Sequence, residues 1–254
     1  MNNTHIIAVA NQKGGVGKTT TSLALAGGLR RRGYNVLLGD LDPQANATDV
    51  YGAAVEGVAT MYDLLVDGDT DCIQTTELGD IIAGDLALKD AGRALDGVSA
   101  AYKLRKGLAK IQGYDFIILD TPPTLSVLLT NALTAASRIV IPLTPDRFGL
   151  QGLIQLGDTI ADIREYTNPN VIVDGLLLIR HDRRTHLGRD VAEQLPSFAG
   201  LLDTKMYNTT IRECIKVREA QAATQCLYTW APGSTTAQDY EAFIDEFLGG
   251  LTNG

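Results

Sequence analysis

The sequence predicts an α/β fold, with a mostly parallel, twisted sheet that carries helices on both faces. Short apolar runs of strand length alternate with longer stretches in which apolar residues recur at helical spacing. This alternation is typical of parallel sheets, because their strands are joined by crossover helices that pack on the two faces. A glycine-rich segment also follows the first apolar run directly, at the carboxyl end of the strand predicted there.

The predicted strands are short apolar runs, and the first is expected to be buried on both faces. They cover residues 6–10, 36–38, 81–83, 116–119, 139–141 and 171–179. Helical spacing predicts helices over residues 19–32, 100–111, 125–136, 150–165 and 186–195. Residues 43–76 have the least regular pattern, and we expect loops there with a short helical excursion. Because no linker, repeat or low-complexity tract divides the chain, we expect one domain over residues 1–254.

Composition narrows the possible functions. Apolar residues make up 45% of the 254 residues, which is enough side-chain surface for one buried core. The net charge of −8 argues against a general polyanion binder, so any contact with nucleic acid requires a local basic patch. Cys72, Cys214 and Cys226 form no CxxC pair, which favours reduced, packed thiols over a zinc or redox site. The longest apolar stretches have strand length, so no membrane-spanning helix is expected.

The glycine-rich segment has the residues of a phosphate-binding loop and predicts a P-loop NTPase fold. Its sequence is Lys13-Gly14-Gly15-Val16-Gly17-Lys18-Thr19-Thr20. It stands between a predicted strand and a predicted helix, as a P-loop requires, and its glycines let backbone N–H groups surround phosphate oxygens. We expect Lys18 to contact the β- and γ-phosphates and Thr19 to place its hydroxyl on Mg²⁺. Gln12 replaces the usual glycine, and Lys13 is an additional lysine, so this is the deviant form of the Walker A motif.

Three aspartates, Asp40, Asp42 and Asp120, lie at the ends of two predicted strands. A single aspartate after a strand is commonly a cap or turn residue. In an open parallel sheet, however, ligands bind at the carboxyl ends of the strands, and Mg²⁺ prefers carboxylates and water. We interpret Asp120 as the Walker B acid, acting on Mg²⁺ through water. Asp42 is our candidate for orienting or activating the attacking water, and we place it with Thr19 around the metal.

Together these motifs resemble the ParA/Soj family of partition ATPases. The matching segments are residues 13–20, 40–44, 120–123, 141–145, 148–153 and 211–221. The resemblance implies ATP and Mg²⁺ as cofactors and an ATP-bound sandwich dimer of two identical chains. In such a dimer Lys13 would reach the nucleotide of the partner subunit, while Lys18 would act within its own subunit. Residues 210–213 do not match the family's pattern before its late helix, so the adenine contacts are not assigned from sequence.

The resemblance also implies a cellular role. It implies dimer-dependent, nonspecific DNA binding and slow ATP hydrolysis, stimulated by a ParB-like or other adaptor that carries a cargo. The cargo would be a plasmid, a chromosomal origin or another object. The protein would then be cytoplasmic and associated with the nucleoid.

A basic segment is the candidate for contact with DNA. Between residues 180 and 219, eight basic residues stand against six acidic ones, in a chain of net charge −8. The proposed patch consists of Arg183, Arg184, Arg189, Arg212, Lys216 and Arg218. Contacts of this kind to phosphates position a protein without reading the DNA sequence. The alternative is an ordinary solvated face, because acidic residues interrupt the basic ones.

Two other functions would explain part of the sequence. A MinD-like, membrane-cycling ATPase would need a C-terminal amphipathic helix with a basic face. Residues 239–248 are amphipathic but acidic, and no lysine or arginine follows Arg218, so we expect no membrane partner. A non-enzymatic DNA-binding protein would explain the basic segment, but it would leave the glycine loop and the three aspartates without a role.

Overall fold

The computed structural model describes residues 4–97, 99–180, 197–200 and 202–252. Within these ranges the strands form one sheet with the order β3-β4-β2-β5-β1-β6-β7. The strands are β1 (His5–Val9), β2 (Val36–Asp40), β3 (Ile73–Thr76), β4 (Gly79–Ile82), β5 (Phe116–Asp120), β6 (Arg138–Leu143) and β7 (Ile172–Leu178). Each neighbouring pair is parallel except β3 and β4, which are antiparallel. The predicted, mostly parallel α/β sheet is therefore confirmed.

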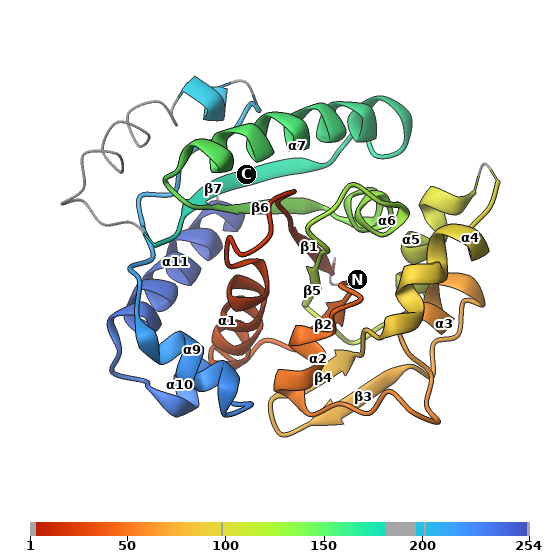
Figure 1. Ribbon diagram of the computed structural model, residues 1–254, viewed down its shortest axis with the longest axis horizontal. Coiled ribbons are helices and arrows are strands. Elements are labelled where there is room, and N and C mark those ends of the chain that lie inside the picture. Colours follow the sequence, from red (N-terminus) through yellow and green to blue (C-terminus); the bar gives the residue numbers. More distant parts are fainter. Residues whose placement is uncertain (1–3, 98, 181–196, 201, 253–254) are drawn as a thin grey trace.

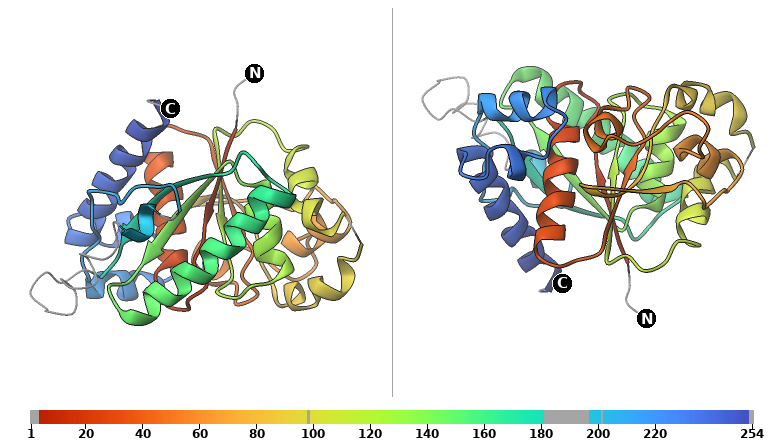
Figure 2. Two further views of the ribbon diagram at one scale, coloured as in Figure 1. Left: turned by 90° about the horizontal axis from the view of Figure 1, so that it is seen from above. Right: turned by 90° about the horizontal axis from the view of Figure 1, so that it is seen from below.

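Helices cover both faces of this sheet (Figures 1 and 2). The described helices are α1 (Lys18–Arg31), α2 (Asn46–Tyr51), α3 (Met61–Val66), α4 (Ala91–Ala94), α5 (Lys103–Leu108), α6 (Val127–Ala135), α7 (Arg147–Tyr166), α9 (Ile215–Ala222), α10 (Leu227–Trp230) and α11 (Thr235–Thr252). Two short 3-10 helices, η1 (Leu86–Asp90) and η2 (Ala100–Tyr102), precede α4 and α5. Helices α1, α10 and α11 pack on one face of the sheet, and α3 to α7 pack on the other.

The central strand β1 shows why its sequence is apolar throughout. Ile7 and Val9 belong to the core beneath α1 and α11. Ala8, between them, belongs to the core beneath α6 and α7 on the opposite face. Successive side chains of a strand point to opposite faces, so a strand covered on both sides must be apolar at every position.

The hydrophobic pattern of the sequence predicts the central strands of the sheet but not the edge strand β3. Strand β3 lies in the region for which loops and a short helix are expected, and α2 and α3 supply the helical part. Its residues Gln74, Thr75 and Thr76 are polar and partly exposed, because β3 is the outermost strand beside β4. An edge strand needs no apolar run, so hydrophobic pattern alone does not detect it. The helix predicted over residues 186–195 lies outside the described residues.

Helix α11 holds the acidic, amphipathic stretch near the end of the chain. Its apolar side chains Tyr240, Phe243, Ile244 and Phe247 are buried in the core shared with α1. Gly28 of α1 permits this close approach, since a Cβ there would lie 2.1 Å from the Ile244 side chain. The apolar face of α11 therefore serves the packing of this chain. Among the described helices, none is long and apolar enough to cross a membrane.

Candidate nucleotide site

The glycine loop and the three aspartates meet at the carboxyl edge of the sheet. The loop joins β1 to α1, and β5 lies between β1 and β2 in the sheet. In the parallel register Asp120 of β5 lies beside Val9 of β1 on one side and beside Asp40 of β2 on the other. Strands far apart in the sequence thus bring the aspartates next to the loop, as the strand-end argument predicts.

The loop backbone takes a conformation that needs glycine. Gly15 and Gly17 have φ values of +73° and +81°, in the left-handed region that other residues adopt at a cost. Gly17 is also the N-cap of α1, and none of the described side chains caps the N-terminus of this helix there. The first N–H groups of α1 are consequently available to a ligand, and the helix dipole favours a negatively charged one.

A cavity of about 450 Å³ lies over this loop, within the usual range for small-molecule sites. Six of the residues predicted to bind nucleotide line it: Gly14, Gly15, Gly17, Lys18, Thr19 and Thr20. Asp42 and Gln44 contribute from the segment after β2, and Gln221 contributes from α9. Two of the predicted residues, Lys13 and Val16, do not line this cavity, and Val16 is instead buried in the protein.

Asp40 and Asp42 have different surroundings although only one residue separates them. Asp40 is buried and accepts hydrogen bonds from the N–H and hydroxyl of Thr48, at 2.9 and 2.8 Å, and from the N–H of Asp42 at 3.1 Å. These contacts fix the segment that follows β2. Asp42 lines the cavity, and its Oδ1 accepts a hydrogen bond from the N–H of Gln44 at 2.9 Å. Asp40 therefore shapes the segment, whereas Asp42 faces the cavity.

Asp120 has the geometry expected of a residue near a hard cation. It is fully buried, and its Oδ1 accepts a hydrogen bond from Ser22 at 2.9 Å. The Thr19 side chain is close enough to lower the pKa of Asp120, yet Oδ2 has no hydrogen-bond partner among the described residues. A buried carboxylate oxygen without a partner, with a hydroxyl beside it, fits a Mg²⁺ site. No three His, Cys, Asp or Glu side chains in the described ranges form a metal cage, so such an ion would also need water or phosphate ligands.

Burial shifts the pKa values of the ionisable groups at this site. Lys18 is only 7% exposed, and burial lowers its pKa, although the charges of Asp120 and Asp42 act in the opposite direction. Burial raises the pKa of Asp120 to about 7, and the charge of Asp40 adds to this effect. The nearby Thr19 side chain, the hydrogen bond from Ser22 and the charge of Lys18 partly counteract the rise.

The raised pKa of Asp120 predicts how stability depends on pH. Between its ordinary value of 3.8 and its folded value of about 7, the folded protein binds more protons than the unfolded chain. The free energy of unfolding should therefore fall as pH rises through this window. Without nucleotide or Mg²⁺, we expect the melting temperature to drop by at least about 3 °C between about pH 5.5 and 8.

Differential scanning calorimetry of the wild type and of Asp120→Asn would measure this effect. The asparagine variant should show a shallower decline, because it cannot ionise at that position. A flat wild-type profile, or stability that increases with pH, would contradict the assigned burial of the carboxyl group.

Lys13 points away from the cavity of its own subunit. Its Nζ lies 2.7 Å from both carboxylate oxygens of Asp146 and 3.3 Å from the hydroxyl of Thr144. Lys18 Nζ instead donates to the backbone carbonyl of Lys13 at 3.2 Å, inside the loop. The two lysines of the deviant motif are thus already separated: one lines the phosphate cavity, and the other is held by the segment after β6.

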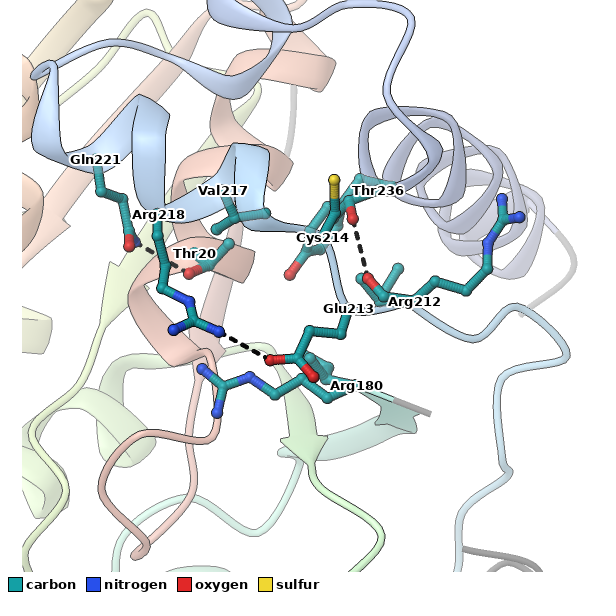
Figure 3. Close-up of a pocket in the computed structure, with 12 residues that line it drawn as sticks. Thr20, Arg180, Arg212, Glu213, Cys214, Val217, Arg218, Gln221 and Thr236 are labelled. Atoms are coloured by element: carbon teal, nitrogen blue, oxygen red, sulfur yellow. Dashed lines mark hydrogen bonds and ion pairs between the residues drawn. The ribbon is translucent and has the colours of Figure 1, made fainter. Parts of the chain in front are cut away.

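A second, smaller cavity of about 50 Å³ lies next to the first, because Thr20 and Gln221 line both (Figure 3). Gln221 donates a hydrogen bond to the hydroxyl of Thr20 at 3.1 Å. Arg180, Glu213 and Arg218 also line the small cavity, and Arg218 forms an ion pair with Glu213 at 3.1 Å. Sequence reasoning did not predict this cavity, since its lining comes from separate parts of the chain: α1, residues 179–180 after β7, residues 211–214, α9 and α11.

The proposed DNA patch is only partly described. Arg183, Arg184 and Arg189 lie outside the described residues. The remaining three cations are exposed and paired with acids: Arg212 with Asp239 at 2.7 Å, Lys216 with Glu219 at 2.6 Å, and Arg218 with Glu213 at 3.1 Å. Figure 3 shows the Arg212 guanidinium directed away from those of Arg180 and Arg218. The described part of the patch therefore has little excess charge.

Comparisons with known proteins agree with the geometry. A family model described as an AAA domain matches residues 4–173. The chain is 38% identical over 243 residues to the sporulation initiation inhibitor protein Soj of Bacillus subtilis (strain 168), a match that covers 92% of this chain and 94% of that protein. It is 37% identical over 225 residues to the chromosome partitioning protein ParA of Caulobacter vibrioides (strain NA1000 / CB15N), with 85% and 83% covered. The chain belongs to the ParA/Soj family of partition ATPases.

A solved structure extends the likeness of this ParA/Soj-type chain to three dimensions. It is a cobyrinic acid a,c-diamide synthase from Mycobacterium smegmatis with bound ADP and magnesium. The TM-score is 0.80 at 30% sequence identity, and the match covers 98% of this chain and 96% of that one. The P-loop ATPase fold, predicted from the glycine loop and from the alternation of strands and helices, is thus shared with a protein whose structure holds ADP and magnesium.

Proposed function

We propose that this ParA/Soj-type chain is a Mg²⁺-dependent ATPase that forms an ATP-bound homodimer, binds DNA nonspecifically and positions a cargo through partner-stimulated hydrolysis. The observation that carries the proposal is the cavity that Lys18, Thr19 and Asp42 line together, above an uncapped helix N-terminus. It combines a site for phosphate groups with a carboxylate that can act on water. A non-enzymatic DNA-binding protein would need neither.

Each part of the nucleotide has a place in this proposal. The phosphates lie against the loop backbone and Lys18, and the base lies toward the smaller cavity beyond Thr20 and Gln221. Thr19 and Asp120, with Asp42 nearby, would hold Mg²⁺. When bound, this ion neutralises charge that develops on the transferred phosphoryl group. Asp42 orients the attacking water and accepts its proton.

The division between the two lysines supports the dimer. Lys18 lines the cavity of its own subunit, whereas Lys13 does not and is paired with Asp146. Lys13 could contact the nucleotide of a neighbouring subunit once it exchanges Asp146 for a phosphate group. A second cation that arrives only on dimerisation would couple assembly to hydrolysis. A ParB-like or other cargo adaptor would act on this assembled state, and the protein would be cytoplasmic and nucleoid-associated.

A MinD-like cycle on membranes is less well supported. The only described segment with the required amphipathic pattern near the end of the chain is α11, and its apolar side chains are already buried against α1. Inserting them into a bilayer would expose the core that fixes the phosphate-loop helix. The acidic residues on its outer side would also be repelled by anionic lipids.

DNA binding tests the proposal at its most distinctive step. We expect binding to unrelated duplexes to require ATP, because a dimer doubles the number of phosphate contacts. The ion pairs of Lys216 and Arg218 are exposed on both sides, so exchanging their acids for a phosphate costs little. The exchange costs more at Arg212, because the side chain of its partner Asp239 is only 12% exposed. Replacing all three cations with alanine should abolish detectable binding. Any residual binding should lose about one unit of log–log salt slope per phosphate contact removed.

Mobility-shift titrations over a salt series would measure this result. Because Arg212 and Arg218 also line the small cavity proposed for the base, calorimetry with Mg-ATP and light scattering must first show that the variant binds ATP and dimerises. A matched control replaces Lys89, Arg105 and Lys106, which are exposed, carry the same total charge and have no ion pair among the described residues. Loss of binding in the control but not in the triple variant would move the DNA surface to η1 and α5. Equal affinity with ADP and ATP would contradict the dimer-dependent step.

A further inference from the structure

Lys13 is held by a set of acceptors that matches its donors. A lysine ammonium has three N–H donors. In this chain the two carboxylate oxygens of Asp146 lie 2.7 Å from Nζ, and the hydroxyl of Thr144 lies at 3.3 Å. Thr144 in turn donates to Asp146 Oδ2 at 2.7 Å, which orients the carboxylate. These contacts can engage every donor of the ammonium group, so Lys13 must give them up to bind a second anion fully.

The backbone on both sides of this contact is anchored. The Lys13 N–H donates to Asn11 Oδ1 at 3.0 Å, and the Asn11 side-chain amide donates to the carbonyl of Pro142 at 2.8 Å. Gly152 of α7 packs on the same place, since a Cβ there would lie 3.2 Å from Asn11 Oδ1 and 3.5 Å from Lys13 Cβ. The base of the phosphate loop is therefore tied to β6 and to α7, the two elements that flank the segment with Asp146. The contact between Lys13 and Asp146 is preorganised.

The contact is nevertheless accessible from outside the subunit. The side chains of Lys13 and Asp146 are 26% and 33% exposed. Ion pairs at this level of exposure are screened by water and contribute modestly to stability. A phosphate group, which presents several charged oxygens, can compete with one carboxylate for the same ammonium group.

We propose that Asp146 is a positioning residue that keeps Lys13 in its own subunit until a phosphate of the partner's nucleotide replaces the carboxylate. This inference rests on the ATP-bound dimer of the proposed function. Breaking the contact opposes dimerisation, and every dimer breaks two such contacts. Asp146 thereby raises the protein concentration at which the ATP dimer forms and limits premature assembly.

The expected result is a change in the dimerisation midpoint, the protein concentration at which half of the chains are in the ATP-bound dimer. In a hydrolysis-arrested Asp42→Ala background with ATP and Mg²⁺, adding Asp146→Asn should lower the midpoint about 10-fold, since two modest ion pairs no longer oppose assembly. Analytical ultracentrifugation over a concentration series would measure it. Asp146→Glu keeps the charge and should stay near the Asp146 value. Asp90→Asn, which removes an exposed ion pair with Arg93, is the matched control and should cause no shift.

A general structural role for Asp146 makes a different prediction. If Asp146 acts through Lys13, then Asp146→Asn should have no effect on the midpoint when Lys13 is already alanine. A shift of the same size with and without Lys13, or no shift at all, would overturn the proposal. Circular dichroism melting would show that each variant is folded before its midpoint is compared.

A second measurement separates this proposal from the dimer itself. Amine labelling of the nucleotide-free protein, read by mass spectrometry, should modify Lys13 roughly 3-fold faster in Asp146→Asn than in the wild type. Exposed Lys106 is the internal reference. An unchanged labelling rate of Lys13 would contradict the positioning role of Asp146 and leave the proposed function untouched. Absence of ATP-dependent dimers in every variant would overturn the proposed function and, with it, the exchange of partners.

Discussion

Lys18→Ala should abolish productive ATP binding and, with it, ATP-dependent dimerisation. Lys18 is nearly buried on the wall of the phosphate cavity, where its ammonium group is held by the carbonyl of Lys13. Ammonium–phosphate contacts are charge-assisted and strong, particularly where water is largely excluded. Removing this cation would also leave Asp42 and Asp120 beside the incoming phosphates without a compensating charge. We expect affinity for ATP to fall at least about 100-fold.

Isothermal titration calorimetry with Mg-ATP would measure that loss, and Lys106→Ala provides a control with the same change at an exposed position. The variant should remain folded, because its core contacts are unchanged. Normal binding and hydrolysis by Lys18→Ala would show that the cavity over the glycine loop is not the nucleotide site.

Asp42→Ala should separate ATP binding from ATP hydrolysis. The carboxylate lines the same cavity, but the glycine loop and Lys18 form the phosphate cradle without it. Loss of a residue that orients and deprotonates water costs roughly 10²- to 10⁴-fold in turnover. We therefore expect a fall of at least about 100-fold in kcat, with ATP affinity retained and the ATP-bound dimer accumulating.

Single-turnover hydrolysis and light scattering would test both halves of this expectation. Asp42→Asn is the more conservative comparison, because it can still accept the hydrogen bond from the Gln44 N–H. Both variants should be impaired if the charge matters. A variant that hydrolyses ATP slowly and also remains monomeric with ATP would assign Asp42 to the shape of the loop or the metal site instead of the water.

Local sequence was sufficient to predict the phosphate loop. Its residues are contiguous, the left-handed backbone at Gly15 and Gly17 requires glycine, and the flanking apolar run and helical pattern place it between β1 and α1. The positions of Asp42 and Asp120 were also predictable, because parallel strands all end at the same edge of the sheet. Both predictions follow from rules that act within one segment or apply to every parallel sheet.

Other features depended on which distant segments the fold brings together. Asp146 contacts Lys13 from 133 residues away, and Gln221 contacts Thr20 from 201 residues away. The distinct surroundings of Asp40 and Asp42 arise because only Asp40 is enclosed by Thr48. Asp239, which pairs with Arg212, likewise lies outside the segment whose charges were counted.

The physical reason is the same in these cases. A backbone conformation or an apolar strand is imposed by neighbouring residues, so the amino-acid pattern contains it. A hydrogen bond or an ion pair between remote side chains depends on sheet order and on the packing of α7, α9 and α11 against it. The sequence by itself therefore determined the fold class, the glycine-loop residues of the phosphate cavity and Asp42 beside them. Only the tertiary structure decided where Lys13 lies, and which charges remain available for a partner.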